Sequence, residues 1–281
     1  MLCGSDGLGI HFNNIGIAQT IGTISLCIIL FSGGMDTKMH EIRPVLKQGV
    51  LLATLGVLLM SLITGVLIWL IFGMTIKSAQ IGFASSLLLA AIMSSTDSAS
   101  VFAILRSKGL RLKNNLRPTL ELESGSNDPM AYILVITLIE IVKINSMPNI
   151  WHILGMIAMQ LCIGVLAGFV LAKMAIVIIN RLKIDNASLY PILVLTFCIL
   201  TFSLTYFLKG NGFLAVYIAG LIIGNNSFQH KRSTVNFFNG LTWLCQLLMF
   251  LTLGLLVNPS ELLSVLIPGL IISIVMIFIA R

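Results

Sequence analysis

Long apolar runs, each about the length of a membrane-spanning helix, recur from one end of the chain to the other. A helix rises about 1.5 Å per residue, so about twenty apolar residues cross the hydrocarbon core of a bilayer. The pattern predicts nine such helices, at residues 15–34, 49–73, 79–105, 118–142, 151–178, 187–208, 212–224, 237–257 and 262–281. The predicted fold class is therefore an all-α polytopic membrane protein.

Two of these segments depart from an uninterrupted apolar helix. Residues 79–105 contain the polar block SSTDS at Ser94–Ser98, with apolar residues on both sides, and residues 212–224 form a short run that glycines border. A polar break at membrane depth is tolerated only where protein or a water-filled cavity surrounds it. We therefore predict a broken helix at Ser94–Ser98, a feature through which secondary transporters expose backbone groups to an ion.

The basic residues gather in alternate loops between the predicted helices. The loop after the third segment has five basic residues and no acidic one, whereas the loops before and after it have one lysine each. Cytoplasmic loops of membrane proteins are enriched in Lys and Arg. The alternation predicts a multi-pass protein of the plasma (inner) membrane, with residues 1–14 outside and the basic loops in the cytoplasm.

Composition agrees with the membrane class. Hydrophobic residues make up 57% of the 281 residues and charged residues 10%, and the mean hydropathy is +1.03. Because the basic residues lie in short loops, the net charge of +7 indicates topology rather than nucleic-acid binding. The five cysteines form no CxxC pair and the histidines show no ligand spacing, so we expect no disulfide framework, no cofactor and no metal beyond a transported cation.

Carboxylates lie inside two of the predicted helices. Asp97 falls in the polar break, and Asp128 lies about ten residues, or about 15 Å, into its own helix. An ionised acid at that depth is costly unless it is paired or solvated, so it is a candidate functional residue. Burial favours its protonated form, and carboxylate, hydroxyl and carbonyl oxygens are ligands that suit an alkali cation. The two acids are candidates for a group that carries a proton and a hard cation in turn.

The stretch ELESGSNDPM, residues 121–130, gives one helix two polar faces. Glu123 and Asn127 are four residues apart and therefore share a face, whereas Glu121, Ser124 and Asp128 fall on an adjoining stripe.

Structural roles compete with these functional ones. Glu121 is expected to cap the cytoplasmic end of its helix, where the helix dipole favours an acid. Asp97 and Asp128 could instead form a buried, hydrogen-bonded structural pair. The serines of the polar break, Ser94, Ser95 and Ser98, are interpreted as packing residues.

The segment SSTDSASVFAILRSKGLRLKNNLRPTLELESGSNDPMA resembles the signature of the bacterial cation/proton antiporter-1 family, the relatives of sodium/proton exchangers. Within that family the chain most resembles the NhaP-type potassium/proton or sodium/proton antiporters. Further matches are ILFSGGMDTK, GNGFLAVYIAGLIIGN, LTLGLLVNPSELL and the terminal FIAR. The resemblance runs through nearly the whole chain.

The resemblance implies roles for particular residues. Asp128 would take up the cation and the proton in turn, and Asn127 would be the neutral partner that marks an electroneutral exchanger. Thr96 and Asp97 would lie in the unwound crossing that helps to form the ion site, and Ser124 would contribute an oxygen to it.

The resemblance also implies a structural ion pair, a fold and an assembly. Glu123 would pair with Arg281 of the FIAR motif. The fold would be an inverted-repeat antiporter fold in a lipid bilayer, assembled as a homodimer. Residues 1–281 would form a single transmembrane antiporter domain that is incomplete, because the family has further helices before and after the stretch that matches. The expected function is electroneutral exchange of K⁺ or Na⁺ for H⁺ by alternating access, and the chain is not expected to be an enzyme.

Three other functions share some of these sequence features. An intramembrane aspartyl protease also needs two acids in the membrane, but its YD-like and GxGD-like motifs are absent from the sequence. A cation channel would fit a broken helix, but no repeated selectivity-filter sequence occurs. An inactive, truncated remnant remains an alternative for a chain that covers only part of an antiporter domain.

Overall fold

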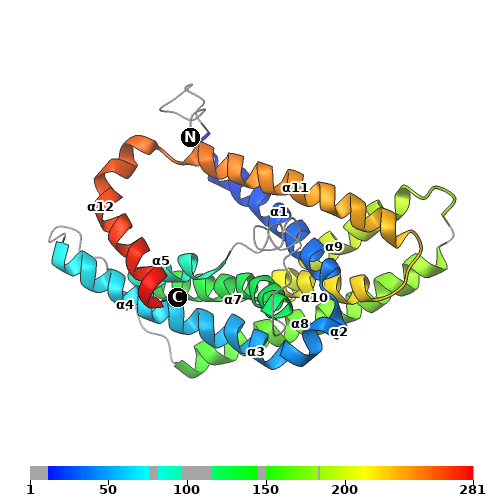
Figure 1. Ribbon diagram of the computed structural model, residues 1–281, viewed down its shortest axis with the longest axis horizontal. Coiled ribbons are helices and arrows are strands. Elements are labelled where there is room, and N and C mark those ends of the chain that lie inside the picture. Colours follow the sequence, from blue (N-terminus) through cyan, green and yellow to red (C-terminus); the bar gives the residue numbers. More distant parts are fainter. Residues whose placement is uncertain (1–11, 76–81, 97–115, 145–149, 183, 281) are drawn as a thin grey trace.

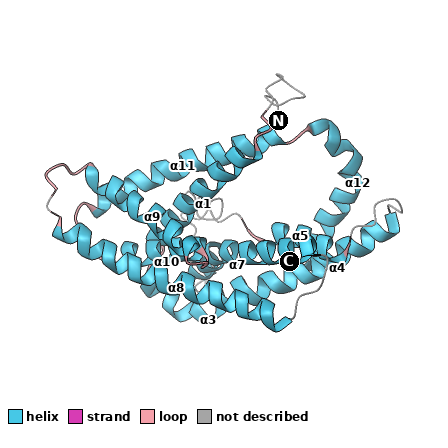
Figure 2. Cartoon of the chain, turned by 180° about the vertical axis from the view of Figure 1, so that it is seen from behind, coloured by secondary structure: helices cyan, strands magenta, loops and turns pink. Residues whose placement is uncertain are grey.

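The computed structural model describes residues 12–75, 82–96, 116–144, 150–182 and 184–280, and the chain in these ranges is built from helices (Figures 1 and 2). In chain order the elements are α1 (Ile15–Asp36), α2 (Met39–Ile42), η1 (Arg43–Val45), α3 (Leu46–Leu51), η2 (Leu52–Gly56), α4 (Val57–Thr75), α5 (Phe83–Ser94), α7 (Leu116–Ile144), α8 (Ile150–Arg181), α9 (Leu189–Phe207), α10 (Gly212–Asn225), α11 (Lys231–Leu256), α12 (Pro259–Val275) and η3 (Met276–Ala280).

The all-helical fold class is confirmed, and each of the nine predicted segments contains a helix in the described ranges. Among the described residues, six spans are long and apolar enough to cross a membrane, and three shorter apolar helices accompany them, including α5 and α10. The second span begins earlier than predicted, at Met39, because α2, η1, α3 and η2 lead without interruption into α4.

The predicted break in the third segment lies where α5 ends. This helix stops at Ser94, and Ser95 has extended backbone angles of φ −75° and ψ 144°. The carbonyl groups of a last helical turn have no helical partner, so the polar block starts where backbone oxygens are free to bind other groups. Asp97 and Ser98 lie outside the described residues.

The helices pack as two groups. We call α1, α8, α9, α10 and α11 the α10 bundle, because α10 packs extensively against α1, α8 and α9. We call α4, α5, α7 and α12 the α7 bundle, in which α5 packs against α4 and α7, and α12 packs against α4. Contacts between the bundles are fewer and join α7 to α10, α1 and α8. Figure 1 shows α4, α5 and α12 toward one end of the long axis, with α9 and α10 toward the other.

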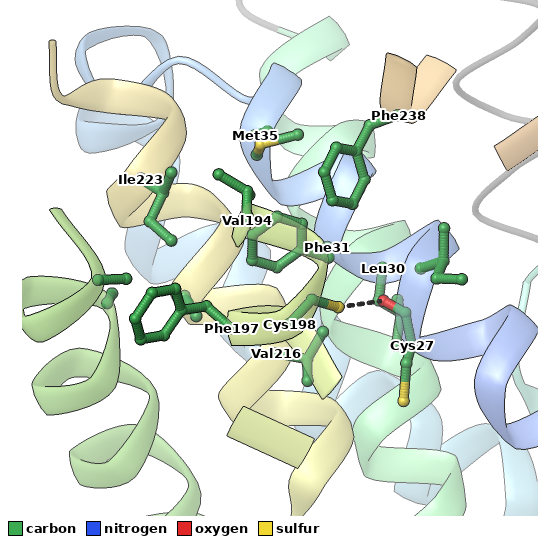
Figure 3. Close-up of a cluster of buried hydrophobic side chains, with 14 of the residues drawn as sticks. Cys27, Leu30, Phe31, Met35, Val194, Phe197, Cys198, Val216, Ile223 and Phe238 are labelled. Carbon is green, nitrogen blue, oxygen red and sulfur yellow. Dashed lines mark hydrogen bonds between the residues drawn. The ribbon is translucent and has the colours of Figure 1, made fainter. Parts of the chain in front are cut away.

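The core of the α10 bundle is a continuous cluster of buried apolar side chains from all five of its helices. The rings of Phe31 on α1 and Phe238 on α11 are 5.1 Å apart, and the Cys198 thiol of α9 lies 3.8 Å from the Cys27 carbonyl oxygen of α1 (Figure 3). This packing joins residues that are far apart in sequence, so the α10 bundle forms a rigid unit on one side of the candidate site.

Glycines let α1 and α10 approach closely. A Cβ added to Gly34 on α1 would lie 2.5 Å from the carbonyl oxygen of Tyr217 on α10, and a Cβ at Gly220 would meet the carbonyl of Phe31. Small residues at such crossings allow membrane helices to pack backbone against backbone. At the end of this crossing, the Asn225 side chain donates to the Thr37 carbonyl at 2.8 Å and accepts from the Met39 amide at 2.8 Å.

Candidate functional site

The end of α5 lies against the middle of α7, and there hydroxyl groups meet a carboxylate and an amide. The Ser95 hydroxyl donates a hydrogen bond to Oδ1 of Asp128. The hydroxyl oxygens of Thr96 and Ser124 are 3.1 Å apart, and the Asn127 side-chain amide donates to the Thr96 hydroxyl. The structure therefore brings together Thr96, Ser124, Asn127 and Asp128, four of the predicted site residues.

The polar face that residue spacing predicts along α7 is present in the structure. Glu123 and Asn127 lie on one face, where the Asn127 amide donates to Oε1 of Glu123 at 3.3 Å. The predicted partner of Glu123, Arg281, lies outside the described residues, as does Asp97. The ion pair between Glu123 and Arg281 therefore stays a prediction.

Glu121 does not sit in the first turn of α7, which begins at Leu116. Its largely buried carboxylate accepts a hydrogen bond of 2.9 Å from Nε of Arg117, four residues earlier, and the Arg117 side chain is 41% exposed. The expectation that Glu121 caps the helix end is therefore replaced by an ion pair along the helix surface.

Asn127 is fully buried, and its amide nitrogen donates to both Thr96 and Glu123. Its carbonyl oxygen, Oδ1, has no hydrogen-bond partner among the residues that the structure describes. A buried acceptor without a partner carries a desolvation penalty, so this oxygen is suited to contact a cation or a donor that enters the site.

Pro129 follows Asp128 and has no backbone N–H, so the carbonyl of Gly125 lacks its usual helical donor. On this side of α7 the ring of Tyr217 from α10 packs against Gly125, where an added Cβ would lie 2.5 Å from Cε2 of the tyrosine. The helix turn that carries Asp128 is therefore held against the α10 bundle at a position where only a glycine fits.

A cleft of about 520 Å³ opens onto the site from between the two bundles. Its polar lining comes from Ser95, Thr96 and Asp128. Its apolar lining comes from both bundles, including Leu26 and Ile29 of α1 and Met249 and Phe250 of α11. The partly buried Asp128 carboxylate thus faces a space that an ion or water could enter along the boundary between the bundles.

The structure corrects the interpretation of Ser95 as a packing residue, because its hydroxyl contacts Asp128 directly. The usable signal was its place next to Thr96 in the polar break, directly after the end of α5.

A carboxylate inside a helical bundle, surrounded by hydroxyls from an interrupted helix and reached through a cleft between two bundles, is the arrangement of a membrane transporter. The sequence matches the family described as "Sodium/hydrogen exchanger, transmembrane" over residues 1–281. The chain belongs to this family of transmembrane sodium/hydrogen exchangers.

Similar proteins are named as antiporters, not as enzymes. The chain is 42% identical over its whole length to the K⁺/H⁺ antiporter NhaP of Alkalimonas amylolytica, and 37% identical to the K⁺/H⁺ antiporter NhaP2 of Shewanella sp. (strain ANA-3). In each case the match covers 48% of the relative, so the chain spans about half the length of these proteins.

The fold also matches a solved structure. The sodium proton antiporter MjNhaP1 from Methanocaldococcus jannaschii, at pH 8, superposes with a TM-score of 0.79 and 25% sequence identity. The match covers 95% of this chain and 64% of that one. The two-bundle arrangement therefore corresponds to an antiporter fold.

Proposed function

We propose that the chain is part of a secondary transporter that exchanges K⁺ or Na⁺ for H⁺, with Asp128 as the group that binds the two ions in turn. The observation that carries this proposal is the cluster of oxygen atoms around Asp128, which opens onto the cleft between the bundles. Hydroxyl, amide and carboxylate oxygens are the ligands that alkali cations prefer.

In this mechanism, the ionised Asp128 binds a cation with help from Ser95, Thr96 and Ser124. Protonation of the carboxylate removes its charge and releases the cation. Because one carboxylate holds either a proton or a cation, the two ions compete and their movements are coupled. Asn127 adds a neutral amide oxygen, so one cation would exchange for one proton and the cycle would be electroneutral.

Asp97 and the ion pair between Glu123 and Arg281 complete the proposal. Asp97 would add a second carboxylate from the break, and the ion pair would hold Asn127 in place through its bond to Glu123. Alternating access would follow from movement of the α7 bundle, which carries the site, relative to the α10 bundle. The small contact between the bundles supports such a movement.

The names of the similar proteins guide the proposed choice of cation. The two relatives at 42% and 37% identity are named K⁺/H⁺ antiporters, whereas MjNhaP1, at 25%, is named a sodium proton antiporter. We therefore propose K⁺ as the preferred transported cation and Na⁺ as the alternative. We further propose that the protein is a homodimer in the plasma membrane and that its basic loops lie in the cytoplasm.

The test is proton flux in liposomes that contain the protein and a trapped pH-sensitive dye. An imposed K⁺ or Na⁺ gradient should drive proton movement in the opposite direction, and Asp128→Asn should remove it. A channel would instead carry the cation without coupled proton movement, and an inactive remnant would carry neither ion. Either outcome would contradict the exchange proposal.

A further inference from the structure

Asn211 joins three helices at the beginning of α10. It is 1% exposed and is the N-cap residue of this helix, where its Oδ1 accepts a hydrogen bond of 3.1 Å from the Leu214 amide. Its own backbone amide donates to the Gln160 carbonyl of α8 at 3.1 Å. Its side-chain nitrogen donates to the carbonyl of Pro129 on α7 at 2.8 Å. The last bond crosses from the α10 bundle to the residue that follows Asp128.

The cap alone does not require an asparagine. Serine, threonine and aspartate cap helices about as well, because the cap uses only a side-chain oxygen. The bond to Pro129 needs the amide N–H₂ group, which those residues lack. The side chain of Asn211 therefore has two separable contacts, a cap within its own bundle and a hydrogen bond to the other bundle.

A second contact between the same two helices lies one turn away along α7. Tyr217 of α10 packs against Gly125, and Asn211 binds Pro129, so α10 touches α7 at the positions three before and one after Asp128. Because α10 is anchored to α1 and α8 by close backbone packing, these contacts fix the turn that carries Asp128 relative to the α10 bundle.

We propose that Asn211 is a positioning residue, whose hydrogen bond to Pro129 stabilises the arrangement of the two bundles seen in this structure and breaks when the bundles move relative to each other. The inference rests on the proposed function in one respect, since alternating access is what would move them. A single neutral hydrogen bond suits this role, because its loss changes the ratio of two states by only about fivefold. The two arrangements therefore stay close enough in free energy to interconvert.

The test uses Asn211→Ser, which keeps a capping oxygen and a neutral side chain but cannot reach Pro129. The matched control is Asn14→Ser, because Asn14 caps α1 through the same bond, to the Ile17 amide at 3.0 Å, and is exposed. Asn211→Asp, which also keeps the cap and loses the donor, is a second variant should the serine variant fold poorly.

The measurement is the distance between spin labels on the two bundles, in the protein in nanodiscs. Cysteines at Val142 of α7 and Phe207 of α9, both exposed, carry the labels on a background without other cysteines. We expect Asn211→Ser to raise the share of a second distance about fivefold relative to the parent, and Asn14→Ser to leave the distribution unchanged.

An unchanged distance distribution in Asn211→Ser would overturn the inference. This holds even if the variant melts at a lower temperature, because lower stability alone would indicate a purely structural role. The distances do not depend on transport. If the parent protein moves no protons in liposomes but the distances shift as expected, the exchange proposal fails and the role of Asn211 stands.

Discussion

The hydroxyl of Ser95 donates a hydrogen bond to the carboxylate of Asp128, although the two residues are 33 positions apart and belong to different segments. The contact exists because α5 stops at Ser94, so the next residue is extended and reaches the middle of α7. A hydroxyl stabilises a carboxylate without neutralising it, which leaves the negative charge available to a cation or a proton. The helix break therefore supplies the site with a ligand that an intact helix would direct elsewhere.

Asp128→Asn should abolish cation-driven proton flux in proteoliposomes, because the amide neither binds a proton at working pH nor carries the charge that attracts the cation. The control is Glu140→Gln, which removes an exposed acid three turns further along the same helix and should leave flux within about twofold of the parent. If the Asp128→Asn variant still exchanged ions in a pH-dependent way, another group would have to carry them.

Ser95→Ala should weaken the apparent affinity for the transported cation about tenfold, since a hydrogen bond to a charged group is lost. The measurement is the KM for K⁺ and for Na⁺ at fixed pH.

Ser94→Ala is the matched control for that variant. The Ser94 hydroxyl is buried and donates to the Ala91 carbonyl of its own helix at 2.7 Å, so its loss should leave KM unchanged. Equal KM values for the two variants would mean that the contact of Ser95 with Asp128 does not contribute to cation binding.

The helices were predictable from the sequence because each is an apolar run of membrane-spanning length, and the face shared by Glu123 and Asn127 followed from helical periodicity alone. The place of Ser95 in the polar break was visible in the sequence, but its contact with Asp128 was not predictable, because that contact depends on which helix crosses α5 at its end. Asn211 was not predictable for a related reason. In the sequence it is an ordinary helix cap in GNGF, and only the packing of α10 against α7 gives its amide a second partner.

Two of the four glycines of α1, Gly34 and Gly22, should differ in their tolerance of alanine. Gly34→Ala places a Cβ 2.5 Å from the Tyr217 carbonyl oxygen and 2.9 Å from the Leu221 amide nitrogen, and backbone atoms cannot move aside as a flexible side chain would. We expect a loss of about 1–3 kcal/mol in stability. Gly22→Ala meets nothing within 4 Å and should leave stability unchanged or raise it by up to about 1 kcal/mol.

Thermal unfolding of the purified variants in one detergent checks this difference. A similar melting temperature for Gly34→Ala and the parent would mean that α1 and α10 are not packed backbone to backbone in solution.

The two ends of α10 should lie on opposite sides of the membrane. Leu208, just before α10, is exposed in a loop with a single lysine. Arg232 lies beyond the far end of α10, among the basic residues that begin α11, and is also exposed. Since basic loops stay in the cytoplasm, a cysteine at Leu208 should react with a membrane-impermeant maleimide added to whole cells, and a cysteine at Arg232 should react only after the cells are opened. Both variants need a background without native cysteines, because Cys162 is exposed. The reverse labelling pattern would invert the proposed topology, and with it the direction from which each ion reaches Asp128.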